Sequence, residues 1–105
     1  MSKAQMHPAV NAALNAWQSG DVQTWLSCFT ADATLLDDGR PRDFREFSRE
    51  IGKERFTSFD KIEDGGMSVY GRFHSDTWGD FPTFFRFHLD ASGRFHTLEI
   101  GQAHD

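Results

Sequence analysis

Apolar residues in the first half of the chain recur at the three-to-four-residue spacing of amphipathic helices. This pattern predicts three short helices, over residues 7–18, from Asp21 to about residue 29, and over residues 43–51. Their apolar faces consist of Val10, Ala13, Leu14 and Trp17, then Val22, Trp25, Leu26 and Phe29, and finally Phe44, Phe47 and Ile51. Because all three helices are short, tertiary packing rather than helix propensity must stabilise them.

From residue 55 onward the apolar positions alternate with a period of two, which is typical of β-strands. We predict strands over residues 56–63, 67–75, 81–89 and 94–100, and a short earlier strand over residues 34–36. The connections are rich in Asp and Gly, the residues that tight turns favour, at 37–41, 64–66 and 90–93. Helices that precede a run of strands indicate an α+β fold, in which the sheet packs against the helices.

The last two predicted strands form a hairpin whose two faces differ. If Leu89 pairs with Arg94, one face carries Thr83, Phe85, Phe87, His96, Leu98 and Ile100. The other face then carries Phe84, Arg86, His88, Phe95, Thr97 and Glu99. The first face is mostly apolar and is expected to pack on the helices. Phe84 and Phe95 are costly to expose, so we expect a second copy of the chain to cover the other face in a homodimer, with a half-exposed sheet as the alternative.

Composition narrows the class of protein. The length of 105 residues predicts a single domain over residues 1–105, and the net charge of −5 argues against nucleic acid as a partner. No apolar run approaches the ~20 residues of a membrane span, and no secretory signal is evident at the N-terminus. The single cysteine, Cys28, excludes an internal disulfide and favours a reducing, cytoplasmic location. Eleven of the aromatic residues are Phe, which indicates either a dense aromatic core or an apolar cavity.

Two parts of the chain resemble the nuclear transport factor 2-like superfamily, which includes SnoaL-like polyketide cyclases and ketosteroid isomerases. Residues 16–22 (Ala-Trp-Gln-Ser-Gly-Asp-Val) and 25–35 (Trp-Leu-Ser-Cys-Phe-Thr-Ala-Asp-Ala-Thr-Leu) are similar to its Gly-Asp helix junction and the strand entry that follows. Residues 87–95 are similar to its closing hairpin. The resemblance implies a cone-shaped, cystatin-like fold: a curved antiparallel sheet wraps about three N-terminal helices and leaves a cavity. The cavity mouth is expected near the ends of the first and third helices and the turn at Asp37-Asp38.

The same resemblance places Asp37 where the steroid isomerases carry the aspartate that moves the proton. A carboxylate beside an apolar cavity suits this role because desolvation raises its pKa. The alternative is that Asp37 only forms the Asp-Asp-Gly turn. The positions of the isomerases' remaining hydrogen-bond donors hold Ala13 and Phe85 here, which excludes a steroid isomerase. In the expected register His96 faces the cavity, as a helper of Asp37 or as a structural histidine at the rim.

Three functions therefore remain open, because the fold hosts many activities. The preferred one is a SnoaL-like domain that binds a small hydrophobic molecule in a Phe-lined pocket. The second is a cofactor-free isomerase, cyclase or dehydratase with Asp37 as general base and His96 as helper. The third is a homodimer whose cavity is filled by its own side chains. We expect neither a metal nor a cofactor, since no metal-ligand spacing or nucleotide-binding loop is present.

The residues expected to contact a ligand are those of the apolar face and of the helices that pack on it. Trp78 lies in the loop before the last hairpin, where an exposed tryptophan is typical of a lid or an interface. The expected ligand-binding residues are Trp17, Phe47, Thr83, Phe85, Phe87, Leu98 and Ile100.

Overall fold

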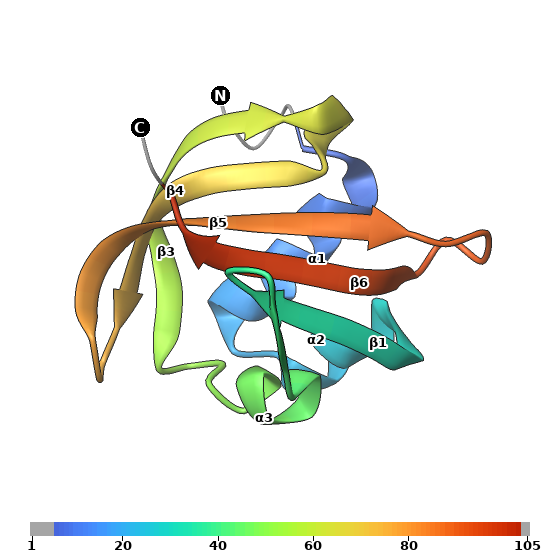
Figure 1. Cartoon of the computed structure of the whole chain (residues 1–105), viewed down its shortest axis with the longest axis horizontal. Coiled ribbons are helices and arrows are strands. Elements are labelled where there is room, and N and C mark those ends of the chain that lie inside the picture. The colour runs from blue at the N-terminus through green and yellow to red at the C-terminus, as the bar shows by residue number, and fades with distance from the viewer. Residues whose placement is uncertain (1–5, 104–105) are drawn as a thin grey trace.

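The computed structural model describes residues 6–103 (Figure 1). The helices are α1 (Pro8–Ser19), α2 (Val22–Ser27) and α3 (Phe44–Ser48), with one further 3₁₀ turn, η2 (Asp64–Gly66). The strands are β1 (Phe29–Asp37), β2 (Arg40–Arg42), β3 (Glu54–Glu63), β4 (Ser68–Ser75), β5 (Gly79–Leu89) and β6 (Phe95–Gln102). The predicted α+β class is therefore confirmed. In the part of the chain that the structure describes, no helix is both long enough and apolar enough to cross a membrane.

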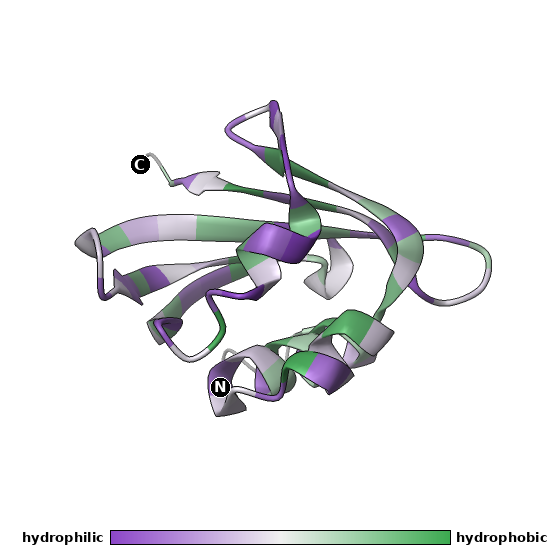
Figure 2. Cartoon of the chain, turned by 90° about the horizontal axis from the view of Figure 1, so that it is seen from below, coloured by the Kyte–Doolittle hydropathy of each residue, from purple (hydrophilic) through white to green (hydrophobic). Residues whose placement is uncertain are grey.

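The six strands form one curved sheet in the order β2-β1-β6-β5-β4-β3. Figure 1 looks onto the sheet with α1 behind it, and Figure 2 shows α1 and α2 together on one side of the curved strands. The expectation of a wholly antiparallel sheet is wrong in one place, because β1 pairs with β6 in parallel. The sheet is consequently mixed, with antiparallel pairing at its other four strand junctions.

Side-chain caps define where the helices begin. His7, Asp21 and Asp43 each accept a hydrogen bond from a backbone N–H in the first turn of α1, α2 and α3. Gly20, in the left-handed conformation at φ 79°, ends α1. The first helix lies within one residue of its predicted bounds, whereas α3 ends at Ser48 and not at the predicted residue 51.

The predicted boundary between α2 and the first strand is wrong. The helical spacing of apolar residues continues through Phe29, but α2 ends at Ser27 and β1 spans nine residues rather than three. Phe29 packs against Trp25 with ring centroids 4.9 Å apart, although the two residues belong to different elements. Phe29 is apolar because it packs on Trp25 across the turn, and its spacing from Trp25 happens to match that of a continuing helix.

The core is a continuous set of aromatic rings between the helices and the sheet. Trp17 of α1 stacks on Phe47 of α3 and meets Trp25 of α2 edge-on, both with centroids 4.9 Å away. The indole N–H of Trp25 donates to the Ser48 hydroxyl at 3.0 Å. The Gln18 side chain ties α1 to β3 through two hydrogen bonds with the backbone of Phe56, which fixes the helix against the sheet edge.

The β5–β6 pairing differs from the predicted register. Phe85 pairs with Ile100 and Phe87 with Leu98, and a bulge skips His96, so that Leu89 pairs with Phe95. The extra residue reverses the face of the sheet to which the side chains at the start of β6 point. As a result Phe95 is fully buried in the core, with its ring centroid 4.8 Å from that of Phe87. The prediction that Phe95 lies on the outer face is therefore wrong.

Candidate functional site

A cavity of about 390 Å³ opens beside the end of β1, between α3, the start of β3 and the hairpin that joins β4 to β5. Such a volume accommodates a small organic molecule. The residues that line it are Asp37, Asp38, Arg42, Phe47, Glu54, Phe73, Trp78, Phe81, Thr83, Phe85, Ile100, Gly101 and Gln102.

Apolar side chains from the sheet and α3 form the inner wall of the cavity. Phe47, Phe73, Phe85 and Ile100 are all buried, and Phe81 is half-buried nearer the mouth. Trp78 also lines the cavity, yet 79% of its surface is exposed. An indole left this open at the rim of an apolar cavity is available to a ligand.

The turn after β1 brings a cation to Asp37. Asp38 and Gly39 adopt left-handed backbone conformations, at φ 52° and 84°, and reverse the chain into β2. Arg42 thereby reaches Asp37, and the Nη1–Oδ2 distance is 2.9 Å. The guanidinium also lies 5.2 Å from the centroid of the Phe47 ring. Asp37 is at the cavity as predicted, but its carboxylate is already held in an ion pair.

Glu54 also lines the cavity, in addition to Asp37 and Asp38, and its carboxylate is held differently from that of Asp37. It is half-buried at the start of β3, opposite Ser75 of β4, whose hydroxyl donates to Glu54 Oε2 at 3.1 Å. Burial raises the pKa of Glu54, and the hydrogen bond from Ser75 offsets only part of that effect. Among residues 6–103, no Lys, Arg or His forms an ion pair with this carboxylate.

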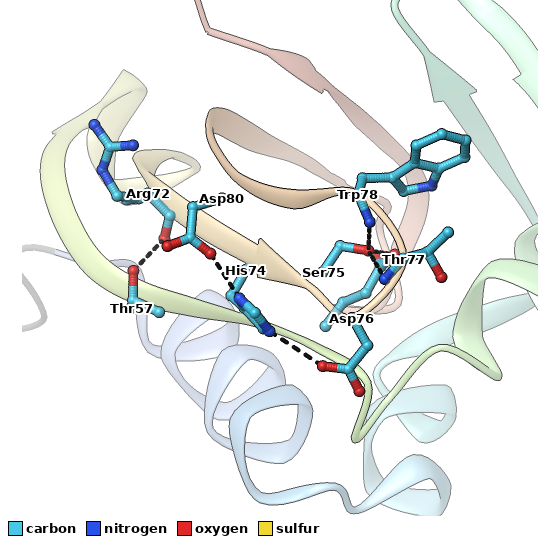
Figure 3. Close-up of polar contacts among 9 residues, drawn as sticks. Thr57, Arg72, His74, Ser75, Asp76, Thr77, Trp78 and Asp80 are labelled. Atoms are coloured by element: carbon cyan, nitrogen blue, oxygen red, sulfur yellow. Dashed lines mark hydrogen bonds and ion pairs between the residues drawn. The ribbon is translucent and has the colours of Figure 1, made fainter.

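Ser75 joins Glu54 to the segment that carries Trp78. Its hydroxyl accepts from the backbone N–H groups of Thr77 and Trp78, both at 3.2 Å. Figure 3 shows these two hydrogen bonds and the Trp78 ring extending away from His74. Ser75 itself is 1% exposed, so one buried hydroxyl positions both the carboxylate and the indole segment.

Glu54 was not among the predicted site residues, although the sequence holds a signal for it. Glu54 precedes the buried Phe56 by two residues on the same strand, so the two side chains share a face of the sheet. A carboxylate at the first position of a strand, on the face that also carries a buried residue, is the pattern that would have identified Glu54.

The structure brings four of the seven expected ligand-binding residues together around the cavity: Phe47, Thr83, Phe85 and Ile100. The Thr83 hydroxyl is not available to a ligand as a donor, because it donates to the Gly101 carbonyl at 2.5 Å. The other three, Trp17, Phe87 and Leu98, are at most 1% exposed and are not part of the cavity wall. They belong to the core behind it.

The placement of His96 on the cavity face is wrong. The bulge leaves this side chain exposed, with its ring 6.1 Å from that of His88, and neither histidine lines the cavity beside Asp37. The expectation that His88 and His96 point to opposite faces is also wrong. His88 Nε2 lies 2.5 Å from Glu99 Oε2 on the outer face of the sheet. Within residues 6–103, no three His, Cys, Asp or Glu side chains form a group that could hold a metal ion.

Solved structures with the same fold are numerous. A candidate polyketide cyclase from Sinorhizobium meliloti has 16% identity and a TM-score of 0.77, with 95% of this chain and 99% of that chain covered. A nuclear transport factor 2-like protein of unknown function from Cytophaga hutchinsonii has 12% identity and a TM-score of 0.72, with 94% and 92% covered. The protein TerC has 14% identity and a TM-score of 0.69, with 90% and 88% covered.

No protein-family model and no curated protein matches the sequence. The structural likeness nevertheless covers nearly the whole of this chain and of the two bacterial proteins. The chain therefore has the nuclear transport factor 2-like fold, as its Gly-Asp helix junction and closing hairpin predicted.

Proposed function

We propose that this protein binds a small hydrophobic molecule in the cavity between α3 and the β4–β5 hairpin. The observation that carries the proposal is the cavity itself, about 390 Å³ in volume and walled by Phe47, Phe73, Phe85 and Ile100. A core with this many large side chains could have filled the space, yet it remains open. An apolar pocket with a few polar groups at its rim is the usual form of a small-molecule site.

One protein of the same fold supports this proposal. TerC was co-crystallised with polyporic acid. The fold can thus accommodate an organic ligand, while the residues that select the ligand differ from one protein to the next.

The proposal is tested by titrating the full chain with neutral aromatic and alicyclic fragments while backbone amide NMR signals are recorded. We expect the largest shifts at Thr83, Ile100 and Gln102, which line the cavity. Phe81→Ala should weaken binding, because this ring lies on the cavity wall. Phe59→Ala is the matched control: Phe59 is equally half-buried but does not line the cavity. Shifts confined to other parts of the chain, or equal effects of both variants, would contradict the proposal.

The alternative function, a cofactor-free isomerase, cyclase or dehydratase, has less support. Its predicted pair is not assembled, because His96 is on the outer face and Asp37 is paired with Arg42. The observation in its favour is the half-buried carboxylate of Glu54, which could move a proton in place of Asp37. Asp37 remains the second candidate for a general base.

A homodimer remains part of the proposal, through the outer face of the sheet. This face holds Phe84, half-buried, with the Arg86 guanidinium 5.0 Å from its ring centroid, and it also holds His88 and Thr97. Because Phe95 is turned into the core, the face is less apolar than we predicted.

The free thiol of Cys28 supports a reducing compartment such as the cytoplasm.

A further inference from the structure

We propose that the cavity selects its ligand by charge and that Glu54 is the residue that does so. The preferred ligand is an aromatic or alicyclic molecule that carries an ammonium group, with the rings against the aromatic wall and the ammonium group at Glu54. This inference rests on the proposed function, since it names the class of ligand for the same cavity.

The charges around the cavity do not balance. Its lining includes the carboxylates of Asp37, Asp38 and Glu54 but, among the described residues that line it, only one cationic side chain, Arg42. Arg42 is already engaged by Asp37 at 2.9 Å and by the face of Phe47. A ligand therefore meets more negative charge than the single cation of the described lining neutralises.

Glu54 is the half-buried carboxylate of the cavity that forms no ion pair among the described residues. Its Oε2 accepts from the buried Ser75 hydroxyl, which leaves Oε1 without a hydrogen-bond donor among the described residues. The charged groups that influence it are Glu50, Arg42 and Asp37, two of which add further negative charge. A half-buried carboxylate in this state gains more from an ammonium group than an exposed one does, because solvent screens the interaction less.

The aromatic wall favours the same ligand. Phe73, Phe81 and Trp78 line the cavity together with Glu54, and aromatic faces attract organic cations through their quadrupoles. Because the Ser75 hydroxyl holds both Glu54 and the backbone of Trp78, the carboxylate and the indole segment keep a fixed relation to each other. An anionic ligand would have to approach three carboxylates and displace Asp37 from Arg42.

The experiment compares three probes that share a naphthalene ring and differ in the head group: naphthylethylamine, naphthylethanol and naphthylacetate. Their affinities for the full chain are measured by calorimetry at neutral pH and moderate salt. We expect the amine to bind at least about tenfold more tightly than the alcohol, and the carboxylate to bind most weakly. Glu54→Gln should reduce the amine's affinity by about tenfold and leave the alcohol's within about twofold. Glu46→Gln is the matched control, since it removes an exposed carboxylate of α3 that does not line the cavity.

The outcomes separate this inference from the proposed function. If the alcohol binds but the amine has no advantage over it, the charge selection is wrong while hydrophobic binding stands. Equal losses of amine affinity in Glu54→Gln and Glu46→Gln would also overturn the role of Glu54, because they would indicate long-range attraction only. If none of the three probes binds, the proposed function itself fails. The comparison of probes on the unmodified protein remains decisive even if Glu54→Gln does not fold.

Discussion

The two ends of the aromatic core are built from the same residue types but differ in how completely their rings are covered. At one end, which we call the filled end, Trp25, Phe29, Phe44, Phe87 and Phe95 are each at most 9% exposed. At the other, the open end, Phe47, Phe73 and Phe85 are equally buried, yet the hollow beside them measures about 390 Å³, against about 260 Å³ beside Phe29 and Phe44, and Trp78 stands in solvent. Trp17 contacts both ends, through Trp25 and through Phe47.

The difference comes from what covers the rings and not from the rings themselves. At the filled end α2 inserts Trp25, whose indole N–H is satisfied by Ser48, and the start of β1 adds Phe29. At the open end β1 ends at Asp37 and β3 begins at Glu54. Charged groups cannot fill an apolar space without a large desolvation cost. Aromatic content therefore predicts a core or a cavity equally well, and the charged residues at the rim decide between them.

The largest expected effect distinguishes the two ends by stability. Trp25→Ala should lower the free energy of unfolding by about 3–5 kcal/mol, because it leaves a cavity among well-packed rings. Phe81→Ala at the open end should cost about 1 kcal/mol or less, since its ring is half-buried beside an existing cavity. Urea denaturation measures both values. Equal losses would show that the open end is packed as tightly as the filled end.

The next effect tests the bulge that turns Phe95 inward. Phe95→Ala should destabilise the protein by about 3 kcal/mol, as expected for a fully buried phenylalanine. Phe84→Ala, on the outer face, should cost about 1 kcal/mol or less and should instead weaken the proposed dimer in light-scattering measurements. If Phe84→Ala proved the more destabilising of the two in dilute monomeric samples, the facing described above would be wrong.

A smaller effect concerns the acid at the open end. Burial raises the pKa of Glu54 in the folded protein above its pKa in the unfolded chain. The charged carboxylate therefore destabilises the native state once the pH exceeds the unfolded-state pKa. Glu54→Gln should therefore raise the melting temperature at neutral pH, and this gain should shrink as the pH falls toward 4.5. A melting temperature that falls at neutral pH, with Glu46→Gln unchanged, would contradict this prediction.

The smallest effect lies in the hairpin that carries Trp78. Hydrogen bonds with Asp80 and then Asp76 raise the pKa of His74 (Figure 3). Because the pKa of His74 is higher in the folded than in the unfolded protein, its protonated form stabilises the native state. The stabilisation is complete at a pH below the unfolded-state pKa near 6.5, and it is lost as the pH rises through the folded-state pKa. His74→Gln should accordingly lower the melting temperature at acidic pH and have little effect at alkaline pH. Asp80→Asn should remove more of this pH dependence than Asp76→Asn, and the reverse order would contradict the assignment.

The parts of the fold that could be predicted are those with a local chemical signature. Asp21 at the start of a helix and Asp38-Gly39 in a turn can be identified through short-range hydrogen bonding and backbone preference. The length of β1 could not be predicted, because its pairing partner β6 lies some sixty residues away in the chain. Alternation along one strand carries no information about a partner so distant.

The candidate site was only partly predictable for a similar reason. Asp37, Phe47, Phe85 and Ile100 were placed correctly because they follow simple periodicity or the fold resemblance. His96 was misplaced because a single inserted residue reverses every facing beyond it, and no composition rule marks where a bulge occurs. That Glu54 forms no ion pair among residues 6–103 depends on the packing of β3 against β4, which the sequence pattern alone does not specify.

The two outermost strands of the sheet have a consequence for how copies of this protein can associate. One border is the three-residue β2, with Pro41 between two arginines, and the other is β3, whose register shifts twice along its length. Short, charged, proline-containing or irregular edge strands resist the edge-to-edge strand addition that leads to fibrils. Addition of a further strand is thus disfavoured at both margins of the sheet, and the dimer proposed above uses the outer face instead.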